Sequence, residues 1–335
     1  MGMTLGTIAM MYLVSRSNWR VIFTISLLLL IFGNILTIFI NNFYAFCCIR
    51  FITGIGGGFI VSLSYTVFGL TAKSDRNFAL GIFFVLLYSA VVYPLLPFIF
   101  NSAGMTGLLI FFACFAVVGL PFVRIMPTSG EEHLDIDKNA VEIDWVNKGL
   151  ALTAMLIFFV ANFAIWTYLF RMGIVAGVSE QSVANSLSIS QFLGMAGAFT
   201  CAIVGARFGR SPLLILGILG CAVPVMFLLG SVGALIYAVI VCAYQYFWNM
   251  THPYLLAAMA SFDPTGKMVV YATAMQFIGV SLGPAVGAML VRSDSFTVVI
   301  YAGIGLLVIS LFLILPPVIR EANLAKQRIT AIQHG

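Results

Sequence analysis

Long apolar stretches separated by short polar turns follow one another along the whole chain. About twenty apolar residues are needed for a helix to cross the hydrocarbon core of a bilayer, and most of these stretches reach that length. The pattern predicts an all-α polytopic membrane protein with eleven helices, in groups of five and six. Their expected ranges are 1–14, 21–40, 43–70, 78–100, 105–126, 149–170, 182–206, 212–230, 232–259, 268–291 and 296–317.

The first of these ranges is too short for a full span. Fourteen residues at 1.5 Å per residue cover about 21 Å, whereas the hydrocarbon core is about 30 Å thick. The range has no basic residue ahead of its apolar part and no small-residue cleavage site, so it is not a secretory signal. We therefore expect that the beginning of this helix is missing from the sequence.

Composition supports the membrane assignment. Hydrophobic residues make up 62% of the chain and charged residues 8%, with a mean hydropathy of +1.10. Soluble proteins carry about 25% charged residues. The six cysteines lie in apolar stretches without the spacing of a zinc site, so we expect buried thiols and no metal or cofactor.

Basic residues gather on one side of the predicted arrangement. The turns on that side hold thirteen Lys and Arg residues, and the opposite turns hold only Arg171 and Arg292. Because cytoplasmic loops of membrane proteins are enriched in Lys and Arg, we expect a multi-pass inner (plasma) membrane protein with a cytoplasmic C-terminus and Met1 outside. The same enrichment explains the net charge of +5 without nucleic acid as a partner.

The longest polar segment divides the two groups of helices. Residues 127–147 hold six of the eleven acidic residues, and we interpret them as a solvated linker. The predicted domains are an N-terminal bundle over 1–126 that lacks its first helix, a cytoplasmic linker over 127–147, a six-helix bundle over 148–317 and a cytoplasmic tail over 318–335.

A permanent charge, Arg50, lies inside the apolar range 43–70. Burying a charge in the membrane is costly, so Arg50 should face a protein partner or a water-filled cavity. Two interpretations stay open: a structural arginine that binds backbone carbonyls, and an arginine on a solute or proton path. Small residues follow it at four-residue spacing and predict a face where another helix packs closely: Gly54, Gly58, Ser62 and Thr66.

The range 232–259 carries a polar and aromatic face at helical spacing, which could line a solute path or simply pack inside the bundle. Aromatic rings suit stacking and amides suit hydrogen bonds to a solute. Asn162 and Trp166, spaced for one helix face, could lie opposite. The candidate residues of this face are Tyr244, Gln245, Trp248, Asn249 and His252.

The acidic residues bear on coupling to protons. All eleven Asp and Glu fall in predicted loops, linker or tail, although carboxylates and histidines are the usual proton relays in membrane helices. Three explanations stay open: the carboxylate belongs to the missing helix, His252 titrates, or transport is not coupled to protons.

Three segments resemble motifs of the major facilitator superfamily (MFS). Arg50-x-x-x-Gly54-x-Gly56-Gly57-Gly58 resembles its motif B, Gly205-Ala-Arg207-Phe-Gly209-Arg210 its motif A, and Gly279-Val-Ser-Leu-Gly283-Pro284-Ala-Val-Gly287 its motif C. The resemblance implies two pseudo-symmetric bundles of six helices each, with a solute path between them. It assigns helix packing or gating to eight residues: Gly54, Gly58, Gly205, Arg207, Gly209, Arg210, Gly283 and Pro284.

The chain departs from the family pattern in three places. Eleven helices stand where the family has twelve, and the first copy of motif A is degenerate before Arg16. The range 78–100 has Pro94 and Pro97 but lacks the Gly-Pro pair of the family's antiporters, which weakens a drug–proton antiporter assignment.

The resemblance implies transport of a small organic solute by alternating access, and we expect proton-coupled efflux. The alternatives are proton-coupled uptake of a small organic acid or sugar, and a truncated, transport-inactive scaffold or sensor. An enzyme is not expected, because the predicted helices hold no HExxH motif, no Asp pair and no Ser/His/Asp set. The expected partners are the solute, protons and the lipid bilayer, with the protein as a monomer.

Overall fold

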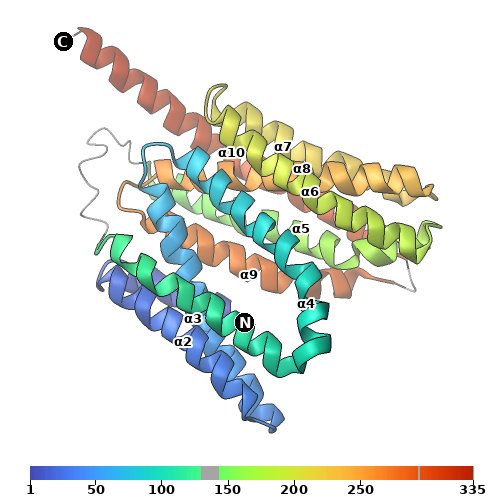
Figure 1. Ribbon diagram of the computed structural model, residues 1–335. Helices are drawn as coiled ribbons and strands as arrows, with labels where there is room; N and C mark the ends of the chain where they lie inside the picture. The colour runs from blue at the N-terminus through green and yellow to red at the C-terminus, as the bar shows by residue number, and fades with distance from the viewer. Residues whose placement is uncertain (130–142, 293–294, 335) are drawn as a thin grey trace.

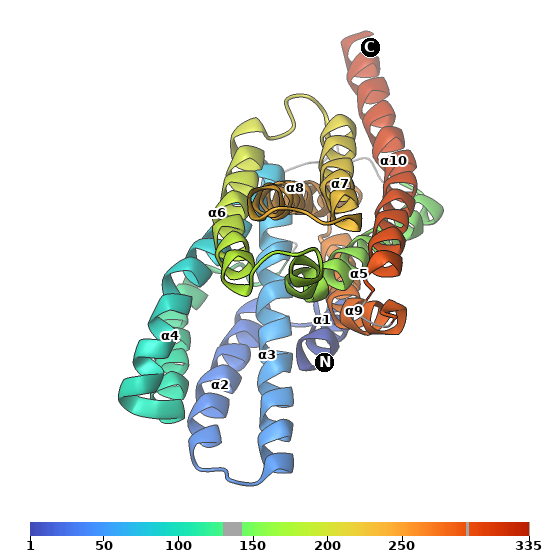
Figure 2. The same ribbon diagram turned by 90° about the vertical axis from the view of Figure 1, so that its right-hand side faces the viewer.

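The computed structural model is a bundle of long helices (Figures 1 and 2). It describes residues 1–129, 143–292 and 295–334, so most of the predicted linker and the lysine at position 138 lie outside the described residues. Within the described residues the backbone is helical apart from turns and one isolated bridge between Arg292 and Ser295. This agrees with the all-α prediction, because a helix satisfies its backbone hydrogen bonds within itself in lipid.

The first half of the chain begins with three helices joined by short turns. They are α1 (Gly2–Leu13), α2 (Trp19–Ile38) and α3 (Phe43–Gly69). Two asparagines set the starts: the side-chain oxygen of Asn18 accepts from the amide of Arg20 (2.9 Å), and that of Asn42 accepts from the amide of Tyr44 (2.9 Å). An N-cap asparagine satisfies amides that have no partner within the helix.

A reversal divides the next element, α4 (Ser74–Gly119), into two crossings. Gly104 has φ 63° and ψ −158°, a conformation that only glycine adopts readily, and the helix axis turns back there. The first part runs beside α6 and the second returns beside α2 (Figure 1). A short 3₁₀ helix, η1 (Leu120–Ile125), ends this half.

The second half contains six helices and a short 3₁₀ turn, η3 (Phe227–Leu229). With α4 counted as two crossings, the described residues contain the eleven predicted helices, and nine are long and apolar enough to span a membrane. The six helices are α5 (Trp145–Val175), α6 (Glu180–Val204), α7 (Arg210–Met226), α8 (Ala234–Ser261), α9 (Lys267–Leu290) and α10 (Thr297–His334).

The buried core is distributed unevenly between the halves. One continuous apolar cluster joins α5 to α10 and includes Phe78 of α4, whereas the first half holds two small clusters around Trp19 and Leu27. Large apolar side chains such as Phe84 and Phe312 are exposed on the outer surface. Such exposure suits helices that face lipid, where the hydrophobic effect does not drive helix association.

The halves meet along several pairs of helices. Contacts join α1 to α9, α4 to α6 and α8, and α3 to α9 and α8. The hydroxyl of Thr4 lies 2.9 Å from that of Ser281, and Val270 of α9 packs in the cluster around Trp19. The space between the two bundles is therefore closed where these helices touch.

The placement of acidic residues in the sequence analysis was wrong in three cases. Asp75 lies in the first turn of α4 and Glu180 in the first turn of α6, because both helices begin before the expected residue. Glu321 lies in α10, which continues to His334 through the residues predicted as a tail. The extension protrudes from the body of the molecule in both views (Figures 1 and 2).

Candidate functional site

The polar and aromatic face of α8 points into the second half. Tyr244 is fully buried, and its hydroxyl donates to the side-chain oxygen of Asn162 on α5 (2.9 Å). The Asn162 side-chain nitrogen donates in turn to the carbonyl of Phe158 (2.8 Å). The structure thus brings α8 against α5 at the residues that the sequence placed opposite each other.

Aromatic rings surround Trp248 in the middle of this face. Its ring centroid lies 5.4 Å from that of Phe163, 6.0 Å from that of Trp166 and 5.8 Å from that of Tyr244. Aromatic pairs at such separations attract one another beyond their area of contact. The cluster therefore offers both firm packing between α5 and α8 and flat apolar surfaces.

His252 lies where the two halves meet. Its Nε2 is 3.1 Å from the side-chain oxygen of Gln276 on α9, and its ring packs on Phe159 of α5 with centroids 5.0 Å apart. Across the boundary, the ring of Tyr65 on α3 lies 6.2 Å away. One side chain of α8 therefore contacts α5 and α9 of its own half and α3 of the other.

Two amides complete this face of α8. Asn249 donates from its side chain to the carbonyl of Gln245 (2.9 Å). Gln245 is 4% exposed, and its side-chain oxygen has no hydrogen-bond partner among the described residues. A buried acceptor without a partner is costly, so this oxygen is suited to a donor brought by a solute or water.

Arg50 stands apart from this cluster. Its guanidinium donates to the side-chain oxygen of Asn34 (3.0 Å), the carbonyl of Gly33 (2.9 Å) and the hydroxyl of Thr37 (2.5 Å), all on α2. Its charge therefore meets neutral acceptors inside the first half, which is the geometry of a strut between α2 and α3.

The predicted small-residue positions lie where helix backbones approach. A Cβ at Gly58 would overlap the carbonyl of Met3 on α1, and one at Gly54 would lie 3.1 Å from the Gly2 Cα. A Cβ at Gly283 would lie 2.9 Å from the carbonyl of Val160 on α5. Pro284 follows in α9, which remains helical through it.

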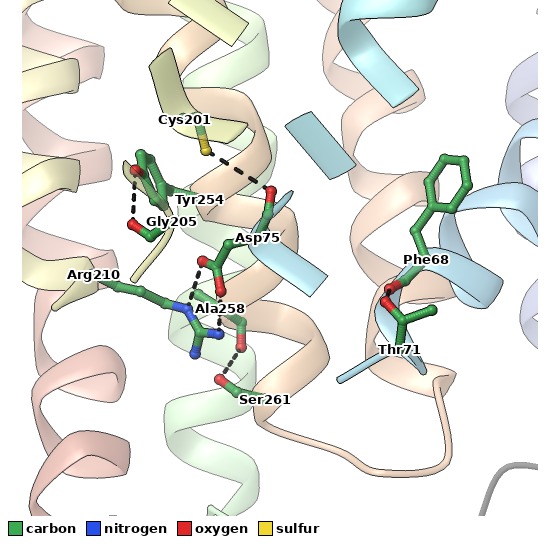
Figure 3. Close-up of polar contacts among 9 residues, drawn as sticks. All are labelled: Phe68, Thr71, Asp75, Cys201, Gly205, Arg210, Tyr254, Ala258 and Ser261. Atoms are coloured by element: carbon green, nitrogen blue, oxygen red, sulfur yellow. Dashed lines mark hydrogen bonds and ion pairs between the residues drawn. The ribbon is translucent and has the colours of Figure 1, made fainter. Parts of the chain in front are cut away.

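An ion pair joins the halves at the face that holds the basic turns. Arg210, the first residue of α7, donates from Nε and Nη2 to the two carboxylate oxygens of Asp75 at 3.0 and 2.9 Å (Figure 3). The two side chains are 17% and 10% exposed. A bidentate arginine–carboxylate pair combines strength with a fixed geometry.

The turn before α7 holds Arg210 in place. Gly205 and Gly209 have φ of 54° and 78°, values that favour glycine. The hydroxyl of Tyr254 on α8 donates to the Gly205 carbonyl (3.0 Å), as Figure 3 shows. Arg207, in the same turn, is exposed and has no partner among the described residues.

The sequence analysis missed Asp75 because it placed this residue in the turn between the expected ranges 43–70 and 78–100. A sequence signal was present: an acidic residue directly after Ser74 and before an apolar stretch is typical of the first turn of a helix. Its partner is 135 positions away, which no local pattern indicates. Among the described residues, no group of three His, Cys, Asp or Glu could hold a metal ion.

Comparison with solved structures finds the same fold in several transporters. A fucose:proton symporter of E. coli, FucP, has a TM-score of 0.72 at 14% identity, over 94% of this chain and 86% of that one. The proton:xylose symporter XylE scores 0.72 at 15% identity, over 93% and 82%. The human organic anion transporter MFSD10 scores 0.72 at 14% identity, over 93% and 80%.

The sequence comparisons identify the family. No curated protein matches the chain. The sequence model described as Major Facilitator Superfamily matches residues 1–266, most of the chain. The protein is therefore a transporter and not an enzyme, and it belongs to the Major Facilitator Superfamily.

Proposed function

We propose that this transporter moves its solute by alternating access, with the α8 face as the solute contact and His252 as the point of proton coupling. Membrane transport of a small solute follows from the family, and the proposal concerns its mechanism and direction. In alternating access, two bundles rock around a site near the middle of the bilayer. A side chain that couples proton binding to transport must then contact both the solute site and the boundary between the two bundles.

The contacts of His252 carry the proposal. Its ring belongs to α8, next to Trp248 and Asn249, and it touches Tyr65 across the boundary between the halves. Adding a proton would place a charge among aromatic rings and Gln276, which favours opening of this contact to water. Histidine is suited to this role because its neutral imidazole ring can take up a proton once the contact opens to water.

The direction we propose is efflux in exchange for protons. Everted membrane vesicles that have acidified their lumen by respiration test it, with acridine orange as the pH reporter and ethidium as the solute. We expect ethidium to dissipate the pH gradient with the wild-type protein and not with His252→Ala. His334→Ala, which removes a histidine at the end of α10, is the matched control and should behave as wild type.

Proton-coupled sugar uptake is the second candidate. The amides and aromatic rings of the α8 face suit a neutral, hydroxyl-rich solute, and two structural neighbours are named as sugar symporters. L-Fucose or D-xylose added to unbuffered cells would then make the medium alkaline. Alkalinisation with either sugar, together with no ethidium response, would replace efflux by uptake. Equal loss of protein and transport in His252→Ala would assign His252 to packing.

A further inference from the structure

A cavity lies away from the α8 face, at the ends of the helices that carry the basic turns. Its volume is about 560 Å³, within the range of small-molecule sites. The turn from α1 to α2 lines it with Arg16 and Trp19, and the start of α9 lines it with Lys267. The cavity is thus built from both halves of the protein.

Its two cationic side chains have no carboxylate partner within residues 1–129, 143–292 and 295–334. Arg16 donates to the hydroxyl of Tyr12, and its guanidinium lies 4.0 Å above the Tyr12 ring. The side chain of Lys267 makes no hydrogen bond or ion pair with the described residues. The carboxylate of Asp263, in the same turn, accepts from the Thr265 hydroxyl (2.8 Å) and the Met268 amide (3.2 Å).

The remaining polar lining suits acceptor oxygens. The hydroxyl side chains of Ser15 and Ser17 line the cavity, and no Asp or Glu is among its lining residues in the described part of the chain. The Thr265 hydroxyl also lines it, but its hydrogen is already donated to Asp263. The start of α9 is not a free anion site, because the Asp263 carboxylate already accepts from the Met268 amide in its first turn. Arg16, Lys267 and the two serine hydroxyls are therefore the groups that suit an anion.

We propose that this cavity binds a phosphate-bearing anion that bridges Arg16 of the first half and Lys267 of the second. A phosphate group has several strong acceptor oxygens, so it can engage two cations and nearby hydroxyls at once. The source is the headgroup of an anionic phospholipid or a soluble phosphorylated compound. Bound there, the anion holds the two halves together at this face and so stabilises the conformation described here.

The test uses the purified full-length protein and measures its thermal unfolding temperature, independently of transport. Inorganic phosphate is titrated against chloride at matched ionic strength. In a second arm the protein is placed in nanodiscs of phosphatidylcholine with or without phosphatidylglycerol. The pocket variant is Arg16→Gln/Lys267→Gln. The control, Arg124→Gln/Lys326→Gln, removes two exposed charges outside the cavity.

We expect phosphate or phosphatidylglycerol to raise the unfolding temperature of the wild type and of the control. The apparent affinity should fall about tenfold for each charge-assisted contact removed, hence about a hundredfold in the pocket variant. A response to phosphate alone identifies a soluble ligand, and a response to phosphatidylglycerol alone identifies a lipid headgroup.

Two results would overturn the proposal. One is the absence of stabilisation of the wild type by both probes, and the other is an equal response of the pocket and control variants, which indicates general electrostatics. If the double variant does not fold, Lys267→Gln alone decides, because Lys267 is exposed and its loss should weaken binding about tenfold.

Discussion

Arg50 and Arg210 are both arginines within helices, and their charges meet different kinds of partner. Arg50 binds an amide oxygen, a carbonyl and a hydroxyl of α2, its neighbour in the same half. Arg210 forms a bidentate ion pair with Asp75 of the opposite half. The first contact moves as one body with its half, whereas the second must break if the halves separate at that face. Only the contact that crosses the boundary between the halves, that of Arg210, therefore depends on whether the halves are together or apart at that face.

The largest expected effect is that of breaking the ion pair. Asp75→Ala removes the carboxylate that binds Arg210 and leaves the weaker charge interaction with Glu321, and removing one partner of a buried pair costs about 3–5 kcal/mol. A double-mutant cycle of Asp75→Asn and Arg210→Gln, followed by thermal unfolding, measures the coupling between them. If the loss of stability in the double variant equals the sum of the losses in the two single variants, Asp75 and Arg210 are not coupled and the pair does not hold the halves together.

Arg50→Ala should cost less. It removes the charge together with its hydrogen bonds, so no buried charge is left unpaired. The Asn34 side-chain oxygen loses its donor, and a buried acceptor without a partner costs about 1–3 kcal/mol. Because Arg50 lies within one half, we expect lower protein abundance with transport per molecule preserved, and most transport retained in Arg50→Lys. Complete loss of transport by Arg50→Lys at normal abundance would place Arg50 on the solute path instead.

The hydrogen bond between Tyr244 and Asn162, two neutral side chains of the second half, can be compared with the charged contacts of Arg210 and Arg50. Tyr244→Phe removes the hydroxyl that donates to Asn162, and a neutral hydrogen bond contributes about 0.5–1.5 kcal/mol. The unfolding temperature should fall slightly. Solute affinity should fall as well, because Tyr244 belongs to the α8 face that we propose as the solute contact. A loss of stability with unchanged solute affinity would restrict Tyr244 to packing α8 against α5.

The smallest effect is expected at Arg207, three residues before Arg210. It has the same charge and lies in the same turn, but it is exposed, so Arg207→Gln should change stability by less than about 0.5 kcal/mol. The measurement is thermal unfolding beside Arg210→Gln. A loss as large as that of Arg210→Gln would mean that the charge of the turn matters more than the ion pair.

Much of the arrangement around α8 was accessible from the sequence. The spacing of Tyr244, Trp248 and His252 predicts one helix face, and Asn162 and Trp166 do contact that face. The two residues that contact His252, Gln276 on α9 and Tyr65 on α3, were not predicted as its partners, because they lie on other helices. A lone amide or tyrosine in an apolar helix gives no sign of which helix it will face.

The sequence by itself determined the helices. Lipid offers no hydrogen-bond partner to backbone N–H and C=O groups, so a run of apolar residues in the membrane forms a helix that satisfies these groups internally. The sequence also placed the small residues that allow close packing, such as Gly58 and Gly283. Only the tertiary structure decided the charged contacts. Asp75 reaches Arg210 and Arg50 reaches Asn34 through the packing of helices against one another, since each pair lies on different helices.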